Sequence, residues 1–528
     1  MNETISAKTI RTVIGASSVG TMIEWYDFYI FGMLAKTIST QFFPEGNSTA
    51  ALLSTLAIFA AGFIVRPFGA LVFGRLGDLI GRKYTFLLTL ILMGGSTFLI
   101  GLVPGYKSIG IAAPLLVLLL RLLQGLALGG EYGGAATYVA EHAPANKRGF
   151  YTSWIQTTAT IGLFIALGVI MAVKLNMSDE QFNKEWGGWR YPFWISVLLV
   201  IVSVYIRMRM HESPLFSKLK AEGKVSKNPL KESFSNKANF KMVLLALFGA
   251  VMGQGVIWYT GQFYAQSFLE TKCGLEFEQS RTIMLWAIAF ATPFFVFFGW
   301  LSDKIGRKWI MLIGMLMGVV LYRPIFSTFL KDTNVKEWMK TGDPSKYTVI
   351  EPAKTDTISK GDTVLMHSKN KLEYNGIRFT EEKFDTLSKE MGYTLYPPLS
   401  SFEKDKSPTY AADKKPVYSN VHLSTSTYWK FVGLVFIMIL MVTMVYGPIA
   451  AFLVEMFPTK IRYTSMSLPY HIGNGVFGGL VPFIGLLLTT SFPSDPLVGL
   501  WYPIGVAALC FIIGIIYLKN GIDEDVTD

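Results

Sequence analysis

One short charged turn occurs twice in this chain, each time between two long apolar segments. The first copy, GRLGDLIGRK, runs from Gly74 to Lys83, and the second, GWLSDKIGRK, runs from Gly299 to Lys308. A hydropathy pattern that repeats with a charged turn at matching places is typical of secondary transporters, whose two halves move about a site between them. The repeat therefore predicts a membrane protein of two related halves that carries a small solute.

The composition is that of an integral membrane protein. Apolar residues make up 51% of the chain and charged residues 16%, and the mean hydropathy is +0.39. Because a bilayer core of about 30 Å needs roughly 20 apolar residues in a helix, twelve spanning helices are predicted. The first holds Glu24 and Asp27 and lacks a small-residue cleavage site, so it is expected to be retained and not removed as a signal peptide. The predicted spans are 13–36, 51–74, 84–103, 113–139, 150–173, 190–209, 242–269, 282–301, 308–330, 429–454, 464–489 and 497–518.

A second repeated turn shows where the chain departs from the repeat. The pattern E-x-x-P-x-x-x-R at Glu141–Arg148 recurs at Glu455–Arg462, 314 positions later, whereas the copies of the first turn are 225 positions apart. About 89 residues are therefore inserted between helices 9 and 10. The insert carries 15 basic and 14 acidic residues and strand-like stretches between Gly and Pro turn signals, which leaves open a small β-rich cap or a partly ordered polar loop.

The predicted fold is an all-α membrane protein. Twelve transmembrane helices form two pseudo-symmetric six-helix bundles, with an extracytoplasmic insert between helices 9 and 10. The predicted parts are an N-terminal bundle at 1–206, a basic cytoplasmic linker at 207–241, helices 7–9 at 242–330, the insert at 331–427, and helices 10–12 with a cytoplasmic tail at 428–528.

Lys and Arg set the predicted orientation. They are more frequent in the loops after even-numbered helices than in the other short loops, so the even loops and both termini are expected in the cytoplasm. The net charge of +11 then reflects topology and gives no reason to expect nucleic-acid binding. Cys273 and Cys510 lie in an outer loop and a spanning helix, so neither a disulfide framework nor a metal site is predicted.

The motifs resemble those of a known family. The repeated turn and RLLQG at Arg121–Gly125 are similar to signatures of the major facilitator superfamily. A narrower resemblance, to the metabolite:proton symporters, covers nearly all the chain except the insert and implies proton-coupled uptake. Members of that subfamily carry proline and betaine, α-ketoglutarate, citrate or shikimate, so the resemblance does not identify the solute. The narrower resemblance rests on EWYDF at 24–28, RPFG at 66–69, GGEYGGA at 129–135, WRYPF at 189–193 and FPTKIRY at 457–463.

The repeated turns are predicted to act as conformational latches. The aspartate can accept hydrogen bonds from the N-terminus of a neighbouring helix, and the basic residues can hold helix C-termini or acidic groups. Such contacts form in one state and break in another, which is what gating requires. A plain positive-inside anchor is the alternative, but two copies at equivalent places favour the latch. The predicted latch residues are Asp78, Arg82, Lys83, Asp303, Arg307, Lys308, Glu141, Arg148, Glu455 and Arg462.

Carboxyl groups within predicted spans are the candidates for proton coupling. An ionised Asp at the bilayer centre costs about 2.5 to 3.5 kcal/mol on insertion scales, so Asp27, Glu24 and Glu131 should be protonated, paired or lined by water. Burial favours the protonated form and an approaching guanidinium favours the ionised one, which makes a proton switch. Arg66 is the expected partner of Asp27. A permanent ion pair or a carboxyl that caps backbone groups is the alternative for each acid.

A polar stripe on helix 7 is the candidate for solute binding. Gln254, Trp258, Gln262 and Gln266 recur at four-residue spacing, and a polar stripe in a membrane helix should face water or solute. Arg66 or Arg121 could bind a carboxylate through two parallel hydrogen bonds. Tyr446, Asn474, Tyr259 and His471 could complete the pocket, although His471 is better explained as a neutral histidine satisfied within helix 11.

The predicted function is proton-coupled uptake of a small carboxylate or zwitterionic metabolite or osmolyte by alternating access. An uncoupled facilitator or exchanger, or a sensor that uses the insert, remains the alternative. An enzyme is not expected, because the chain has no G-x-x-x-x-G-K-[ST] loop or H-E-x-x-H motif, and no cofactor or metal is expected. The expected partners are the lipid bilayer, the solute and the proton. The protein is expected to work as a monomer in the plasma (inner) membrane.

Overall fold

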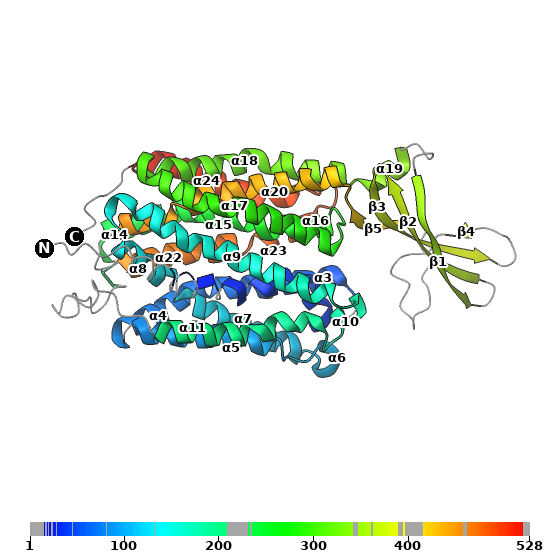
Figure 1. Ribbon diagram of the computed structural model, residues 1–528, viewed down its shortest axis with the longest axis horizontal. Coiled ribbons are helices and arrows are strands. Elements are labelled where there is room, and N and C mark those ends of the chain that lie inside the picture. The colour runs from blue at the N-terminus through cyan, green and yellow to red at the C-terminus, as the bar shows by residue number, and fades with distance from the viewer. Residues whose placement is uncertain are drawn as a thin grey trace. The chain divides into compact units, whose positions relative to one another are not determined.

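The computed structural model describes most of the chain, in two units (Figure 1). Unit 1 comprises Met1–Ala265, Leu285–Pro324 and Val435–Asp528, and unit 2 comprises Gln266–Met284 and Ile325–Leu434. Each unit is described separately. Within them, the described residues are 15, 18, 21–22, 25–27, 29–44, 46–80, 82–130, 132–208, 231–232, 235–341, 347–360, 363–388, 394–395, 416–457 and 462–520.

The N-terminal part of unit 1 is helical. Its first long helix begins where the Asn47 side chain accepts a hydrogen bond from the Ala50 amide at 2.9 Å, which satisfies an N–H that the helix cannot. The helices of this part are α2 (Ala35–Phe42), α3 (Ser48–Ile64), α4 (Arg66–Ile80), α5 (Arg82–Ile100), α6 (Tyr106–Ile109), α7 (Ala112–Gly129), α8 (Tyr132–His142), α9 (Arg148–Leu175), α10 (Asp179–Asn183) and α11 (Tyr191–Met208).

The C-terminal part of the chain is helical apart from the strands of unit 2, and residues of α16, α17, α18 and α20 are divided between the units. Three π-helical turns, η3 (Leu247–Val251), η4 (Thr260–Tyr264) and η7 (Ile472–Gly478), interrupt the helices. The helices are α14 (Lys237–Ala246), α15 (Met252–Tyr259), α16 (Ala265–Thr271), α17 (Phe277–Ile305), α18 (Arg307–Asp332), α20 (Thr425–Tyr446), α21 (Ile449–Met456), α22 (Arg462–His471), α23 (Val481–Ser491) and α24 (Trp501–Tyr517).

Nine helical segments within the described residues are long and apolar enough to cross a membrane. Two shorter apolar helices, Leu88–Ile100 and Gly188–Val202, add to them. The chain is therefore a multi-pass membrane protein, as the composition predicts. The nine segments are Ser48–Phe73, Ala112–Gly129, Arg148–Leu175, Lys237–Thr271, Phe277–Ile305, Arg307–Asp332, Thr425–Met456, Thr464–Ser491 and Val498–Tyr517.

Glycines let α3 and α4 pack very closely against α7. A Cβ added to Gly125 would lie 1.7 Å from the Gly62 carbonyl oxygen, and one added to Gly129 would lie 2.0 Å from that of Arg66. Neither position can hold a larger residue without moving a backbone. Close backbone approach of this kind gives membrane helices the van der Waals contact that holds them together.

Unit 2 contains a sheet that follows α18. After the short helix α19 (Val335–Thr341), the strands lie in the order β1-β2-β3-β4, all antiparallel, and β5 also pairs with β3. Asn375 and Gly376, with φ of 51° and 75°, form the two-residue turn between β2 and β3, which suits a tight hairpin. The strands are β1 (Tyr347–Lys360), β2 (Thr363–Tyr374), β3 (Ile377–Ser388), β4 (Thr394–Leu395) and β5 (Val417–His422).

Strand β5 ties the sheet to the loop between α16 and α17, within unit 2. The Val421 amide donates to the Gly274 carbonyl at 2.8 Å, and the Gln279 side chain bonds both the N–H (2.7 Å) and the carbonyl (3.2 Å) of Leu423. Phe379 and Val421, each 2% exposed, belong to the apolar core of the sheet. The nearby thiol of Cys273 and that of Cys510 in unit 1 are both buried and free.

Candidate functional site

An aromatic cluster joins the first and second halves of the chain within unit 1. The ring centroid of Trp258 on α15 lies 5.4 Å from that of Trp25 and 5.7 Å from that of Tyr29, both from the first predicted span. On its other side, Trp258 stacks on Tyr446 of α20 at 5.8 Å. All four rings are buried. The cluster therefore lies where segments of both halves meet.

Buried polar side chains accompany this cluster on α15 and η4. Gln254, Trp258 and Gln262 are at most 1% exposed. Among the described residues, both amide atoms of Gln262, Nε2 of Gln254 and Nε1 of Trp258 have no hydrogen-bond partner. Burying such groups without a partner costs about 1–3 kcal/mol each, so these atoms favour a binding site for a polar ligand.

Two π-helical turns shape this region. Gln262 lies in η4, and Asn474 lies in η7 and donates to the Gln254 Oε1 atom at 2.8 Å. A Cβ added to Gly255 would lie 2.5 Å from the Gly473 carbonyl oxygen, so α15 and η7 are in backbone contact. π-helical turns are rare and frequent at functional sites. The sequence predicts a span over 242–269, and the structure has an apolar helical segment over Lys237–Thr271 that contains η3 and η4.

Arg66 lies at the break between α3 and α4. Pro67 follows it and has no N–H to continue the helical ladder. The side chain of Arg66 is 2% exposed, and its guanidinium carbon lies 4.3 Å from the Phe63 ring centroid and 5.5 Å from that of Trp25. Arg66 therefore brings a positive charge to the edge of the aromatic cluster, where a cation over aromatic faces is stabilised.

Asp27 points away from the cluster. Its carboxylate is buried, with Oδ2 3.3 Å from the position of a Cβ added to Gly94 on α5, and neither oxygen has a hydrogen-bond partner among the described residues. The expected pairing with Arg66 is therefore not found in the described part of the chain. Instead, Gln124 of α7 donates to the backbone carbonyl of Asp27 at 3.2 Å and accepts from Arg121.

Arg121 lies inside the first half of the chain. Its guanidinium carbon is 4.5 Å from the Phe31 ring centroid and 4.9 Å from that of Phe59, and it is fully buried. Its contacts with the Phe59 carbonyl and the Phe31 ring connect α7 to α3 and to the first predicted span. This position places Arg121 with Gln124 and Asp27, whereas Arg66 lies with Trp25.

Tyr446 begins a chain of buried tyrosines that crosses between the halves. Its hydroxyl lies 2.6 Å from that of Tyr470 on α22. The ring of Tyr470 stacks on Tyr132 of α8 at 3.7 Å with an interplanar angle of 4°. The Gln156 amide donates to the Tyr132 hydroxyl. Tyr446 is a predicted site residue, but its tyrosine partners could not be predicted, because nothing in the sequence relates α8 to α22.

A second cluster lies where α9 begins, and it is ionic. Asp303 of α17 accepts hydrogen bonds from the Gly149 and Phe150 amides, both at 2.8 Å, so it caps the N-terminus of α9. Arg307 of α18 bonds Asp303 at 2.6 Å and Glu455 of α21 at 2.9 Å. The four side chains of this ionic network are Asp303, Arg307, Glu455 and Arg148, which bonds Glu455 at 3.3 Å. All are at most 9% exposed.

The remaining predicted residues either bond backbone carbonyls or lie outside the part of the chain that the structure describes. Lys308 donates to the carbonyls of Ile515 (2.9 Å) and Leu518 (2.7 Å) at the C-terminus of α24, and Arg462 donates to the Phe457 carbonyl at 3.1 Å. The other predicted residues cannot be placed: Glu24 and Glu131, and the side chains of Asp78, Arg82, Lys83 and Glu141, lie outside the part of the chain that the structure describes.

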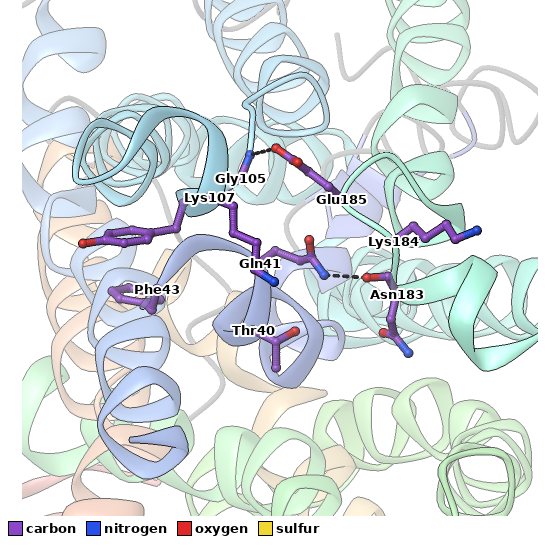
Figure 2. A pocket seen from close by; sticks show the side chains of 9 residues that line it. Thr40, Gln41, Phe43, Gly105, Lys107, Asn183, Lys184 and Glu185 are labelled. Atoms are coloured by element: carbon purple, nitrogen blue, oxygen red, sulfur yellow. Dashed lines mark hydrogen bonds between the residues drawn. The ribbon is translucent and has the colours of Figure 1, made fainter. Parts of the chain in front are cut away.

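A cavity of about 390 Å³ lies where the C-terminal end of α2, the start of α6 and the end of α10 meet (Figure 2). Glu185 accepts hydrogen bonds from the Gly105 amide (2.7 Å) and the Ser108 hydroxyl (2.6 Å), and Gln41 donates to the Asn183 carbonyl at 2.6 Å. The sequence does not predict this cavity, because its residues share no motif. It is lined by Thr40, Gln41, Phe43, Gly105, Tyr106, Lys107, Asn183, Lys184 and Glu185.

These bonds predict a pH-dependent contribution of Glu185 to stability. The Ser108 hydroxyl and Gly105 amide hold the pKa of Glu185 below its ordinary value, so the carboxylate stabilises the fold above the unfolded-state pKa of about 4.3. Glu185→Gln should lower the melting temperature by about 1–2 °C at pH 7. The difference from the unsubstituted protein should shrink as the pH falls through the folded-state pKa. A difference that grew on acidification would contradict this role.

Comparisons with known proteins give the family. A protein-family model described as sugar (and other) transporter matches residues 12–227. The inner membrane metabolite transport protein YhjE of Escherichia coli K12 is 41% identical over 306 residues, which cover 57% of this chain and 68% of that protein. The α-ketoglutarate permease of the same organism is 37% identical over 320 residues, which cover 61% and 72%. The chain belongs to the sugar (and other) transporter family of the major facilitator superfamily.

Solved structures of the major facilitator fold align with nearly the whole chain. A structure of a double tryptophan mutant of XylE has a TM-score of 0.64 at 14% identity and covers 97% of each chain. A structure described as the proton:xylose symporter XylE, bound to 6-bromo-6-deoxy-D-glucose, has a TM-score of 0.61 at 15% identity and covers 98% and 97%. At these identities the likeness shows the fold alone. The relatives of this family member are transporters, so it is a membrane transporter and not an enzyme.

Proposed function

We propose that this transporter takes up a small carboxylate or zwitterionic metabolite together with a proton, by alternating access between its two halves. The main support is the group of buried polar atoms without partners beside Trp258, because the surrounding rings come from both halves. Relatives named for α-ketoglutarate and for proline and betaine fit a solute of this kind. The proposed site residues are Arg66, Gln254, Trp258, Gln262, Tyr446 and Asn474, with Arg121 nearby.

The proposed topology has twelve spanning helices, both termini in the cytoplasm, and the segment 331–427 as an extracytoplasmic insert. It is supported by the nine apolar helices and two shorter ones among the described residues, and by the excess of Lys and Arg in the even-numbered loops. A relative named as an inner membrane protein supports an inner-membrane location. A monomer suffices for this mechanism, because both halves belong to one chain.

Asp27 is the proposed proton carrier, with Glu24 and Glu131 as further candidates. Asp27 lies two positions along the helix from Trp25 and two from Tyr29, so a rotation of this helix moves the carboxyl and the solute-facing rings together. When Asp27 releases its proton, Arg121 is the cation that we propose to stabilise the carboxylate, because Gln124 links the two residues. Proton release and movement of the solute site would thereby be coupled.

The ionic network around Asp303 and Arg307 is the proposed cytoplasmic latch. It joins α9 of the first half to α17, α18 and α21 of the second. A state in which the halves separate at this end must break these bonds. We therefore assign the structure to a state that is closed toward the cytoplasm. By the repeat, Asp78, Arg82, Lys83 and Glu141 are proposed to act in the same way at the equivalent turns.

The test of proton coupling is external alkalinisation. Adding the solute to de-energised cells should raise the external pH transiently if solute and proton enter together. Uptake without alkalinisation would instead establish the uncoupled facilitator or exchanger. Transport that survives deletion of 331–427 would count against a sensor that depends on the insert.

Arg66→Lys should weaken apparent solute affinity roughly tenfold while the protein still folds. Lysine keeps the charge but loses the planar fork that bonds a carboxylate twice, and a hydrogen bond to a charged group is worth about 1.5–3 kcal/mol. Concentration dependence of uptake measures the effect, and size-exclusion chromatography in detergent checks folding. Normal affinity in this variant would exclude bidentate recognition by Arg66.

A further inference from the structure

We infer that the central site selects a hydroxylated carboxylate, such as a sugar acid, over a zwitterion or a plain carboxylate. This inference rests on the proposed transport function and deepens it by naming the solute class. It follows from which hydrogen-bonding atoms are available around Trp258, and from the charges that surround them.

The buried amide of Gln262 lacks hydrogen-bond partners among the described residues. Its Oε1 atom accepts no hydrogen bond and its Nε2 atom donates none within the described part of the chain, although the residue is fully buried. A ligand that satisfies it must therefore both donate and accept. A carboxylate only accepts, and a protonated ammonium group only donates, whereas a hydroxyl does both. Adjacent hydroxyls are thus the simplest match for this amide.

Two further hydrogen-bond donors, on Gln254 and Trp258, lie on α15. Asn474 already occupies Oε1 of Gln254, so the Gln254 Nε2 group remains a donor, and Nε1 of Trp258 is a second donor. Both lie on α15, four residues apart, and so on one face of the helix. They require acceptors, which hydroxyl and carboxylate oxygens supply. The rings of Trp25, Tyr29 and Trp258 offer apolar faces to the C–H groups of the same molecule.

The charge beside the aromatic cluster favours an anionic solute. Arg66 stacks on Trp25 at the edge of the cluster and gives a fixed positive charge that favours a carboxylate. The carboxylate of Asp27 faces Gly94 on α5, on the other side of its helix, and no described ion pair involves a residue of the aromatic cluster. An ammonium group would therefore lack a described counter-ion here. A quaternary ammonium could rest on the rings, but it would leave both atoms of Gln262 unsatisfied.

The experiment measures binding to the purified full-length chain by calorimetry, with D-gluconate, D-glucuronate, D-glucose, hexanoate and glycine betaine as probes. At least one of the two sugar acids should bind about 10- to 100-fold more tightly than hexanoate, which lacks the hydroxyls, and than glucose, which lacks the carboxylate. Equal or tighter binding of betaine or hexanoate would overturn the inference. Failure of both sugar acids to bind would also overturn it.

Variants of one helix locate the selectivity. Gln262→Leu should abolish the preference for the sugar acid over hexanoate and leave hexanoate binding nearly unchanged, whereas Gln262→Asn should restore part of the preference. Thr260→Val is the control in the same helical segment, because the Thr260 hydroxyl already donates to the Val256 carbonyl at 2.6 Å. A preference that survives in Gln262→Leu would contradict the assignment.

The proposed transport function can fail separately. Tight sugar-acid binding without solute-induced alkalinisation would refute proton coupling and leave the solute class intact. Proton-coupled uptake of betaine, with no sugar-acid binding, would refute the solute class and leave proton coupling intact.

Discussion

Replacing Asp27 with asparagine is expected to abolish uphill accumulation of the solute and to leave solute exchange across the membrane in place. Asparagine keeps the size of the side chain but cannot carry the proton, so the cycle loses its driving force while both states remain accessible. Accumulation in energised vesicles should fall to the equilibrium level, and counterflow of labelled solute should persist. These two measurements on one preparation separate loss of coupling from loss of binding.

A matched control for this substitution is Asn474→Asp, which places a carboxyl in the solute site and not behind helix 1. It should impair binding, because the new charge disrupts the bond to Gln254, and it should not mimic the uncoupled behaviour. Full accumulation by Asp27→Asn would end the assignment of Asp27. In that case Glu24 and Glu131 would be the remaining candidates among the acids of the predicted spans.

The second large effect is expected at Asp303. Asparagine there cannot carry the charge that complements the N-terminus of α9 and the Arg307 guanidinium. A coupling free energy of about 1–3 kcal/mol shifts a balanced equilibrium by a factor of about 5 to 150. Asp303→Asn should therefore populate states open toward the cytoplasm, slow the cycle and preserve intrinsic solute affinity within one state.

Accessibility of introduced cysteines reports this shift. A cysteine near the start of α9 should react faster with a membrane-impermeant thiol reagent in inside-out vesicles of Asp303→Asn than in those of the parent. Lys304→Gln is a suitable control, because Lys304 follows Asp303 but stacks on Trp300 and is not part of the ionic network. Unchanged accessibility together with lost solute binding would show that Asp303 belongs to the solute site and is not a latch.

Sequence patterns identified the membrane class and the family, because both depend on features that composition and short motifs carry directly. Long apolar runs follow from bilayer thickness, and the charged turn recurs in recognisable form. The kinds of contact made by the second copy of the charged turn, Gly299–Lys308, could also be predicted. Asp303 caps a helix N-terminus and Lys308 holds a helix C-terminus, because the ends of helices carry unpaired N–H and C=O groups of opposite polarity.

The direction of Asp27 was open to prediction but was missed. Residues two apart on a helix differ by roughly 200°, so Asp27 cannot share a face with both Trp25 and Tyr29. The expectation of an Asp27–Arg66 pair came from similar depth in the membrane and ignored this angle. By contrast, the π-helical turns η4 and η7 and the cavity beside Glu185 depend on how distant segments pack, which a single sequence does not specify.

The two native cysteines have a practical consequence. Cys273 is 3% exposed and Cys510 is fully buried, and neither is bonded to the other. Thiol reagents in water reach buried sulfur slowly, so the natural chain is a low-background template for attaching fluorophores or spin labels. Pairs of labels on the two halves would then record distance distributions of a protein that needs no prior removal of its own thiols.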